Sequence, residues 1–214
     1  MIKSLLFDMD GILVDTEPIL ARAVMLALAD QGVDLTEQEY YDHWTKQGKG
    51  ILDFVSEKMI PLDIKKYRST RNRIYLEFLR TNIPVFDGVK ETIAELSKTY
   101  KLGLVSSSSR EFVHFILKSI DLEYFLAIIT SEDVKEEKPA PEGFLLAAER
   151  LLVEPKECVV IEDAEKGILA AKHAGMKAIA IPNKSTSDND FSGANLILES
   201  IKSLTLLKDM LETC

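Results

Sequence analysis

Cysteine, tryptophan and histidine are scarce in this chain of 214 residues, which contains two cysteines, one tryptophan and three histidines. Cys158 lies inside an apolar run and Cys214 at the extreme end, so a disulfide framework is excluded as the basis of the fold. We interpret Cys158 as a small buried apolar residue. His43, His114 and His173 show no metal-ligand spacing, which favours surface or helix-face positions for them.

Long uncharged apolar segments and an excess of basic residues are also missing. No uncharged run approaches the ~18 residues that span a bilayer, and the first residues lack the apolar segment of a secretory signal. Acidic residues outnumber basic ones by 35 to 26, which gives a net charge of −9. Because nucleic acids and anionic membranes both require basic surface, neither is expected as a partner. We expect a cytoplasmic protein. We also expect a monomer, because the sequence shows no apolar helix that would need a partner chain to cover it.

The second half of the chain alternates between short apolar runs and helical spacing of apolar residues. An apolar run near the start of the chain predicts the first strand at residues 5–7. The second half predicts further strands and helices in alternation, ending in a short terminal helix. Such alternation indicates right-handed crossovers and a parallel sheet that is covered on both faces. The predicted strands after the first are 102–105, 125–129, 158–161, 178–181 and 196–198, and the predicted helices between them are 112–120, 141–152 and 164–174.

Between the first strand and the rest lies a block with helical spacing only. Helices are predicted over residues 17–31, from Thr36 on, over 51–59 and over 63–80, and Thr36 with Glu39 has the spacing of a capping box. The fold class is therefore α/β, a doubly wound parallel sheet of Rossmann type with an inserted small α-helical cap. The core comprises residues 1–15 and 85–214, and the cap comprises residues 16–84, rising over the carboxyl edge of the sheet.

Polar residues follow the predicted strands at their carboxyl ends, where ligands bind in open α/β sheets. Asp8 and Asp10 end the first strand, and Gly11 lets the backbone turn sharply. Ser106 and Ser107 open a four-serine run after a later strand, in which Ser108 or Ser109 is predicted to cap the next helix. The two remaining features are Lys138, in a segment that its prolines make rigid, and the pair Glu162 and Asp163.

These groups suit phosphoryl transfer to a carboxylate. An aspartate that attacks a phosphate dianion is repelled by it, so a divalent cation held by oxygen ligands must lie between them. Lys138 and the serine end of a helix would spread the remaining charge, and the second aspartate could protonate the leaving alkoxide. A covalent aspartyl-phosphate divides one difficult step into two. An anionic, phosphorylated small metabolite is therefore the expected partner.

The chain strongly resembles the haloacid dehalogenase superfamily, and within it the sugar-phosphate phosphatases and β-phosphoglucomutase-like proteins. The resemblance covers the whole chain in order, including the helical cap after the first motif. It is carried by four motifs, Asp8-Met-Asp10-Gly11 with Asp15-Thr16-Glu17, then Ser106, then Lys138-Pro139-Ala140-Pro141, and then Glu162-Asp163 with the Gly167, Ala170, Ala171 and Gly175 that follow.

The resemblance implies a role for each matching position. Asp8 would be the nucleophile and Asp10 the general acid and base. The resemblance implies Mg²⁺, bound by Asp8, the backbone carbonyl of Asp10 and Asp163, with Glu162 beside or just behind them. Ser106, with its neighbour Ser107, and Lys138 would hold the phosphoryl group. Glu137 is a departure, since relatives often have glycine before the lysine.

Substrate specificity is expected from the cap. Asp15 and Thr16, at its hinge, and the cap cations Lys49 and Arg71 are candidate substrate contacts. β-Phosphoglucomutases carry a cap histidine that helps control the aspartyl-phosphate, and the corresponding position here is Leu20.

We therefore expect a phosphatase that releases phosphate from a small phosphorylated metabolite, with a sugar phosphate as the expected substrate. The alternatives are a β-phosphoglucomutase-type isomerase and a non-catalytic binding protein on the same fold.

Overall fold

The computed structural model describes residues 1–206 and contains two compact units. The α/β unit comprises Met1–Asp15, Pro84–Lys184 and the chain from Asn189 on, and the helical unit comprises Thr16–Ile83 with Ser185–Asp188. The expected boundary at residue 84 thus lies one residue earlier. Residues 185–188, which were expected in the core, group instead with the helical unit.

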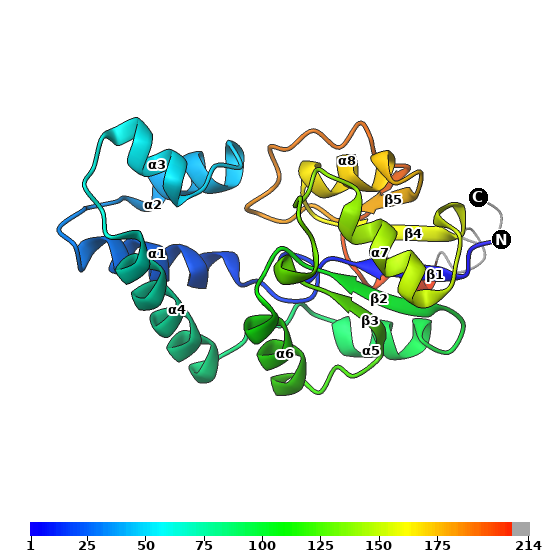
Figure 1. The fold of residues 1–214 in the computed structure, drawn as a ribbon. Coiled ribbons are helices and arrows are strands. Elements are labelled where there is room, and N and C mark those ends of the chain that lie inside the picture. Colours follow the sequence, from blue (N-terminus) through cyan, green and yellow to red (C-terminus); the bar gives the residue numbers. More distant parts are fainter. Residues whose placement is uncertain (207–214) are drawn as a thin grey trace. The chain divides into compact units, whose positions relative to one another are not determined.

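The α/β unit is built on a six-stranded sheet in which every neighbouring pair is parallel (Figure 1). The strand order is β3-β2-β1-β4-β5-β6, so β1 lies in the interior of the sheet. This arrangement confirms the predicted fold class. The strands are β1 Ser4–Phe7, β2 Lys101–Val105, β3 Phe125–Ile129, β4 Cys158–Glu162, β5 Lys177–Ala180 and β6 Leu196–Ile197.

Helices cover both faces of this sheet, which is why its central strands are continuous apolar runs. Helices α5 (Val89–Leu96) and α6 (Arg110–Ser119) lie on one face, and α7 (Glu142–Leu151) and α8 (Glu165–His173) lie on the other (Figure 1). All four residues of β1 and all five of β4 are buried. Three short helices complete the unit, namely η2 Ser131–Asp133, η3 Pro155–Glu157 and α9 Ser203–Leu206.

The register of the central strands determines which residues meet at the carboxyl edge. Phe7 is opposite Leu104 of β2 and Ile161 of β4. The residues that follow these three positions therefore emerge together, although Leu104 and Ile161 are far from Phe7 and from each other in the chain. This places Asp8 next to the ends of β2 and β4.

The helical unit contains α1 (Glu17–Ala29), α2 (Glu37–Tyr40), α3 (Ile51–Lys58) and α4 (Ile64–Thr81). The predicted capping box at the start of α2 is present, because Thr36 Oγ1 accepts the Glu39 N–H and Glu39 Oε2 accepts the Thr36 N–H. The core of the unit consists of Ala21, Val24, Ala27, Leu28, Leu35, Tyr40, Phe54 and Tyr67.

A π-helix at Tyr41–Lys46 follows α2 directly and was not predicted. It carries His43 into the core of the helical unit, where the imidazole is buried and Nε2–H donates to the Gly50 carbonyl at 3.1 Å. His43 lies on a helix, as expected, but it is buried instead of exposed, because the extra residue of a π-turn changes the face that a side chain occupies. Trp44 stacks on Tyr40 at a ring distance of 5.2 Å and so packs within the helical unit.

No helix within residues 1–206 is long and apolar enough to cross a membrane. The predicted terminal helix begins as α9, and the rest of that segment, together with Cys214, lies outside the described residues.

Candidate active site

Asp8 is the first residue after β1, and the sheet holds its backbone. Its N–H donates to the Ile161 carbonyl of β4 at 3.0 Å, and its side chain is buried. The Lys138 ammonium donates a hydrogen bond to Asp8 Oδ1. A carboxylate with a fixed backbone and a single cation against it is suited to presenting one oxygen to a substrate.

The turn after Asp8 requires a glycine at position 11. Gly11 has φ of +91°, and its N–H donates to the Val14 carbonyl at 2.8 Å. A Cβ at this position would lie 2.1 Å from Asp163 Oδ2. Both the left-handed backbone and the missing side chain are therefore needed for the turn to approach Asp163.

The serine run binds the second aspartate. Ser108 Oγ donates to Asp10 Oδ2 at 2.8 Å, Ser106 Oγ donates to the same oxygen at 3.3 Å, and the Ser108 N–H donates to Ser106 Oγ at 3.0 Å. Ser106 is buried, and Ser107 lies beside it. The sequence did not indicate a contact of the serine run with Asp10.

Neither predicted serine caps helix α6 with its side chain. Ser109 occupies the N-cap position but makes no side-chain cap bond, and Ser108 donates to Asp10 instead. The Arg110 N–H in the first turn of α6 donates to Glu132 Oε2 at 2.9 Å. The acidic residue that follows β3 thus supplies the acceptor that the serines were expected to supply.

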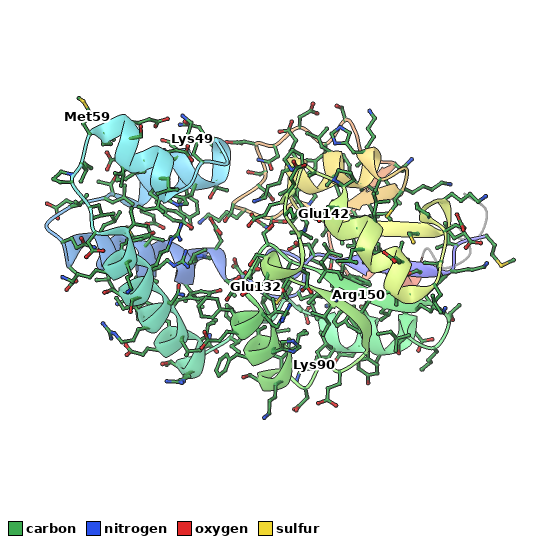
Figure 2. All side chains as sticks on the ribbon, viewed as in Figure 1. Lys49, Met59, Lys90, Glu132, Glu142 and Arg150 are labelled. Carbon is green, nitrogen blue, oxygen red and sulfur yellow. The ribbon has the colours of Figure 1, made fainter. Side chains whose placement is uncertain are left out.

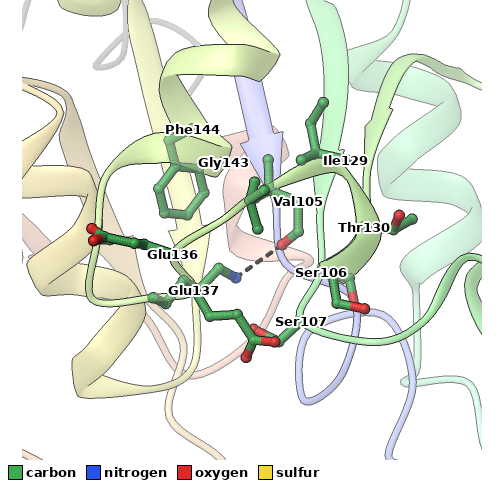
Figure 3. A pocket seen from close by; sticks show the side chains of 13 residues that line it. Val105, Ser106, Ser107, Ile129, Thr130, Glu136, Glu137, Gly143 and Phe144 are labelled. Carbon is green, nitrogen blue, oxygen red and sulfur yellow. Dashed lines mark hydrogen bonds between the residues drawn. The ribbon is translucent and has the colours of Figure 1, made fainter.

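Lys138 joins three elements through its ammonium. Besides Asp8, it donates to the Val105 carbonyl at 2.9 Å, drawn as the dashed line in Figure 3, and to Glu162 Oε1 at 2.7 Å. Its side chain is only 6% exposed and lies 5.1 Å from the centre of the Phe144 ring. An ammonium has three protons, and here all three have protein acceptors.

The segment that carries Lys138 is held by two side chains from the helices beside it. Glu142 Oε2, at the start of α7, accepts the N–H groups of Lys135 and Glu136 at 2.9 Å each. His173 Nδ1–H donates to the Pro139 carbonyl at 3.0 Å, and the Lys138–Pro139 peptide is cis. Figure 2 shows Glu142 on α7. These bonds support the loop without the glycine that relatives often have at position 137.

Glu162 and Asp163 have different surroundings although they are adjacent. Glu162 Oε2 accepts the N–H groups of Asp163 and Ala164 at 2.9 and 3.0 Å, and Lys138 binds its other oxygen. Asp163 Oδ2 accepts from Asn183 Nδ2 at 2.7 Å, and the same nitrogen lies 3.3 Å from the Gly11 carbonyl. Asn183 thus links Asp163 to the turn after Asp8.

The pKa values of this cluster reflect burial and an excess of negative charge. Burial raises the pKa of Asp8 to about 7 against the attraction of Lys138, and Glu162 and Asp10 add to the rise. Burial, with Glu162 and Asp8, also raises the pKa of Asp163 well above its usual range. Burial alone would lower the pKa of Lys138, but Asp8 and Glu162 outweigh it and raise that pKa. One ammonium therefore serves more carboxylates than it can neutralise.

This charge imbalance fits a bound divalent cation. Within residues 1–206, no three acidic, histidine or cysteine side chains come close enough to enclose an ion by themselves. Mg²⁺ characteristically takes one or two carboxylates and keeps several waters. The carboxylates of Asp8 and Asp163, with the carbonyl of Asp10, form a donor set of that kind.

A small pocket that opens to solvent adjoins the phosphoryl-binding candidates (Figure 3). Ser106, Ser107 and Lys138 line it together with Thr130 and Phe144. The three residues predicted to hold the phosphoryl group thus share one wall of the α/β unit.

Of the remaining candidates, Asp15 ends the first segment of the α/β unit, and Thr16, Lys49 and Arg71 belong to the helical unit. Asp15 is half-buried and its N–H donates to the Pro84 carbonyl at 2.8 Å. Thr16 is buried at the N-cap of α1. Lys49 pairs with Glu57 at 2.7 Å, and Arg71 donates to the side chain of the adjacent Asn72.

Comparison with known proteins identifies the family. The family model described as haloacid dehalogenase-like hydrolase matches residues 5–181. The chain belongs to this family. The match extends over both units and over all four motifs of the site.

Several of the similar proteins are named phosphatases, and some similar solved structures are named β-phosphoglucomutases. The chain is 32% identical to the phosphorylated carbohydrates phosphatase of Thermotoga maritima, covering 98% of this chain and all of that protein. It is 31% identical to hexitol phosphatase B of Escherichia coli O157:H7, covering 98% and 97%. The structure of CbbY from Rhodobacter sphaeroides in complex with xylulose-(1,5)bisphosphate has a TM-score of 0.84 and 27% identity, covering 95% and 96%. The predicted superfamily and enzyme class, a phosphoric monoester hydrolase, are confirmed.

Asn183 is the member of the cluster that sequence reasoning missed. It lies three residues after β5, and the rule that polar residues at strand ends converge could have indicated it. Its loop is rich in Ser, Asp and Asn and resembles an ordinary solvated turn, so the composition of the loop did not indicate that Asn183 belongs to the site.

Proposed function

We propose that this hydrolase releases phosphate from a small phosphorylated metabolite of the sugar-phosphate class, through an aspartyl-phosphate on Asp8. The observation that carries the proposal is the pairing of a buried Asp8 with Lys138, while Asp10, two residues on, is bound by the serine run. One acid is thereby placed to attack, and the other is placed to move protons.

The Asp8 and Asp163 carboxylates and the Asp10 carbonyl would hold Mg²⁺. When bound, the ion offsets the repulsion between the Asp8 carboxylate and the phosphoryl oxygens. Both oxygens of Glu162 already accept hydrogen bonds, from Lys138 and from two backbone N–H groups. Glu162 therefore acts by fixing Lys138, behind the residues that touch the ion.

The reaction has two steps that share Asp10. First, an oxygen of Asp8 attacks phosphorus, the bond from phosphorus to the ester oxygen breaks, and the Asp10 carboxyl gives its proton to that oxygen. Then water attacks the same phosphorus while Asp10 takes a proton from it, and the bond to Asp8 breaks to release phosphate. Lys138, the Ser106 hydroxyl and the Ser107 N–H group stabilise the phosphoryl oxygens in both steps.

The substrate class rests on the relatives, whose names specify phosphorylated carbohydrates and a hexitol phosphate. Asp15, Thr16, Lys49 and Arg71 are the proposed contacts to the rest of the substrate. Lys49 would exchange Glu57 for a substrate anion and Arg71 would exchange Asn72. We place the enzyme in the cytoplasm, where sugar phosphates are made and consumed, as a monomer.

The test is phosphate release from a panel of sugar phosphates with Mg²⁺, comparing wild type with Asp8→Asn. Wild type is expected to hydrolyse several members and Asp8→Asn none, while Asp121→Asn, an exposed aspartate in a left-handed turn, keeps full activity. Equal inactivity of wild type and Asp8→Asn would favour a binding protein. Conversion of β-glucose 1-phosphate without phosphate release would favour a mutase.

A further inference from the structure

The Asp10 carboxylate is held on one oxygen by two hydroxyl groups of the serine run. Ser108 Oγ lies 2.8 Å from Asp10 Oδ2, and Ser106 Oγ lies 3.3 Å from it. Asp10 comes from the turn after β1, whereas both serines follow β2, nearly a hundred residues later. Such a long-range contact restricts the rotamer of Asp10.

The two serines are not equivalent in this contact. A hydroxyl has one proton to donate. If the proposed function holds, the Ser106 hydroxyl donates its hydrogen bond to a phosphoryl oxygen during turnover. Its 3.3 Å contact with Asp10 is then lost. Ser108 has the shorter bond, and its N–H donates to Ser106 Oγ, so its position is coupled to that of Ser106.

We propose that Ser108 is a positioning residue that holds Asp10 toward the serine run, and so keeps the proton donor in place throughout the reaction. The inference rests on the proposed function. Asp8 and Asp10 are only two residues apart, and the bond from Ser108 holds the Asp10 side chain on the side of the serine run. Proton transfer requires the donor to stay within hydrogen-bond reach of the leaving oxygen.

Phosphate esters whose leaving oxygens differ in their need for a proton can distinguish two roles of Ser108, namely positioning of Asp10 and binding of the phosphoryl group. A sugar alkoxide is strongly basic and needs a proton to leave, a phenolate is assisted by one, and p-nitrophenolate is stable without a proton. The quantity to compare is kcat/KM, since it reports phosphoryl transfer to Asp8 and does not depend on the later hydrolysis. The probes are glucose 6-phosphate, phenyl phosphate and p-nitrophenyl phosphate, each with Mg²⁺.

Ser108→Ala is expected to lower kcat/KM about tenfold for glucose 6-phosphate and phenyl phosphate, the size of effect that loss of one hydrogen bond to a charged group produces. It should change the value for p-nitrophenyl phosphate less than about twofold. Ser108→Thr, which restores the hydroxyl, should recover most of the loss. Ser109→Ala is the matched control, because Ser109 makes no side-chain cap bond.

A double-mutant cycle gives the second readout. In an Asp10→Ala background, Ser108→Ala should have no further effect on any of the three esters, since the group that it positions is gone. Circular dichroism melting of each variant verifies that the fold is kept.

Two results would overturn the inference. An equal loss on all three esters would show that Ser108 binds the phosphoryl group, and no loss on any would show that its bond to Asp10 is without consequence. In both cases wild-type activity leaves the proposed function intact. A wild type that is inactive on all three esters overturns the proposed function, and the inference with it.

Discussion

At the scale of single residues, Lys138 is the cation that the buried carboxylates share. Its ammonium binds Asp8, Glu162 and the Val105 carbonyl, and its side chain is almost fully enclosed. Glu162 is turned toward it by two backbone N–H groups. The lysine therefore stabilises the folded site and also supplies the charge that a phosphoryl group would meet.

Removing this charge should destabilise the protein as well as inactivate it. Lys138→Met leaves Asp8 and Glu162 buried without their cation, and breaking a buried ion pair costs about 3 kcal/mol or more. Urea denaturation is expected to show that loss, and phosphate release should fall below detection.

Lys90→Met provides the control, because Lys90 is exposed on α5 (Figure 2). A Lys138→Met variant as stable as Lys90→Met would show that Lys138 does not neutralise the cluster.

Replacing Asn183 should weaken the binding of Mg²⁺ without changing the steps of phosphoryl transfer. Its amide holds Asp163 Oδ2 at 2.7 Å, and residues that orient a metal ligand affect affinity by about 10-fold to 100-fold. We expect Asn183→Ala to raise the Mg²⁺ concentration for half-maximal activity about tenfold. The rise in Tm that Mg²⁺ causes should shrink in parallel, a readout that does not depend on turnover.

Asn82→Ala, an exposed asparagine at the end of α4, should leave both quantities unchanged. Unaltered Mg²⁺ dependence of Asn183→Ala would contradict the assignment of Asp163 as a ligand.

The residue roles that sequence could supply are those that follow a strand directly. Asp8, Ser106 and Glu162 each come after an apolar run, so their meeting at one edge follows from a parallel sheet. The bond from Ser108 to Asp10 and the link from Asn183 to Asp163 depend on distances between loops. Spacing within one segment carries no information on such distances.

At the scale of elements, Asp133 fastens the loop after β3 to two helices. Its carboxylate accepts from Arg150 of α7 at 2.8 Å, from Arg110 of α6 at 3.1 Å, and from the hydroxyl and N–H of Thr130. Figure 2 shows Arg150 on α7. Glu132 of the same loop accepts the Arg110 N–H at the start of α6. The loop therefore also holds the helix that follows the serine run.

The stability that Asp133 provides should depend on pH. Burial opposes its charge, but the bonds from Arg150, Thr130 and Arg110 outweigh burial and hold the pKa of Asp133 well below its usual range. A carboxyl with a lowered folded-state pKa stabilises fully above its unfolded pKa of about 3.9, and the contribution is lost as pH falls toward the folded value. Asp133→Asn should therefore lower Tm at pH 7, and the difference from wild type should shrink below about pH 4.

Thermal melts of both proteins from pH 7 to pH 3 measure this. Asp121→Asn, in an exposed turn, should show no such pH-dependent difference. A constant gap between wild type and Asp133→Asn across the range would contradict the role of the charge.

Sequence predicted strands and long helices well but not the π-helix at Tyr41–Lys46. Strands such as Lys101–Val105 are marked by buried apolar runs, and α2 begins at a capping box that is visible as Thr36 and Glu39. A π-turn adds one residue to a helix that is otherwise continuous. The tyrosine, histidine and tryptophan of that stretch are compatible with either helical spacing, so the pattern did not distinguish them.

At the scale of the whole molecule, the chain is a parallel α/β unit interrupted after its first strand by a helical unit. The interruption was readable because helical spacing without strands extends from residue 16 to 84. The grouping of residues 185–188 with the helical unit was not readable, since it arises from contacts such as Lys46 with Asp188 at 3.6 Å, far apart in sequence.

The central claim is that Asp8 carries the phosphoryl group, and one measurement tests it directly. Asp10→Asn mixed with p-nitrophenyl phosphate and Mg²⁺ should release about one p-nitrophenolate per enzyme in a rapid burst, because that leaving group needs no proton while the later hydrolysis needs Asp10 as base. Mass spectrometry of the acid-quenched enzyme should then find the phosphoryl group on Asp8. A burst with the group on another residue, or no burst from a variant whose wild type hydrolyses the ester, would contradict the account.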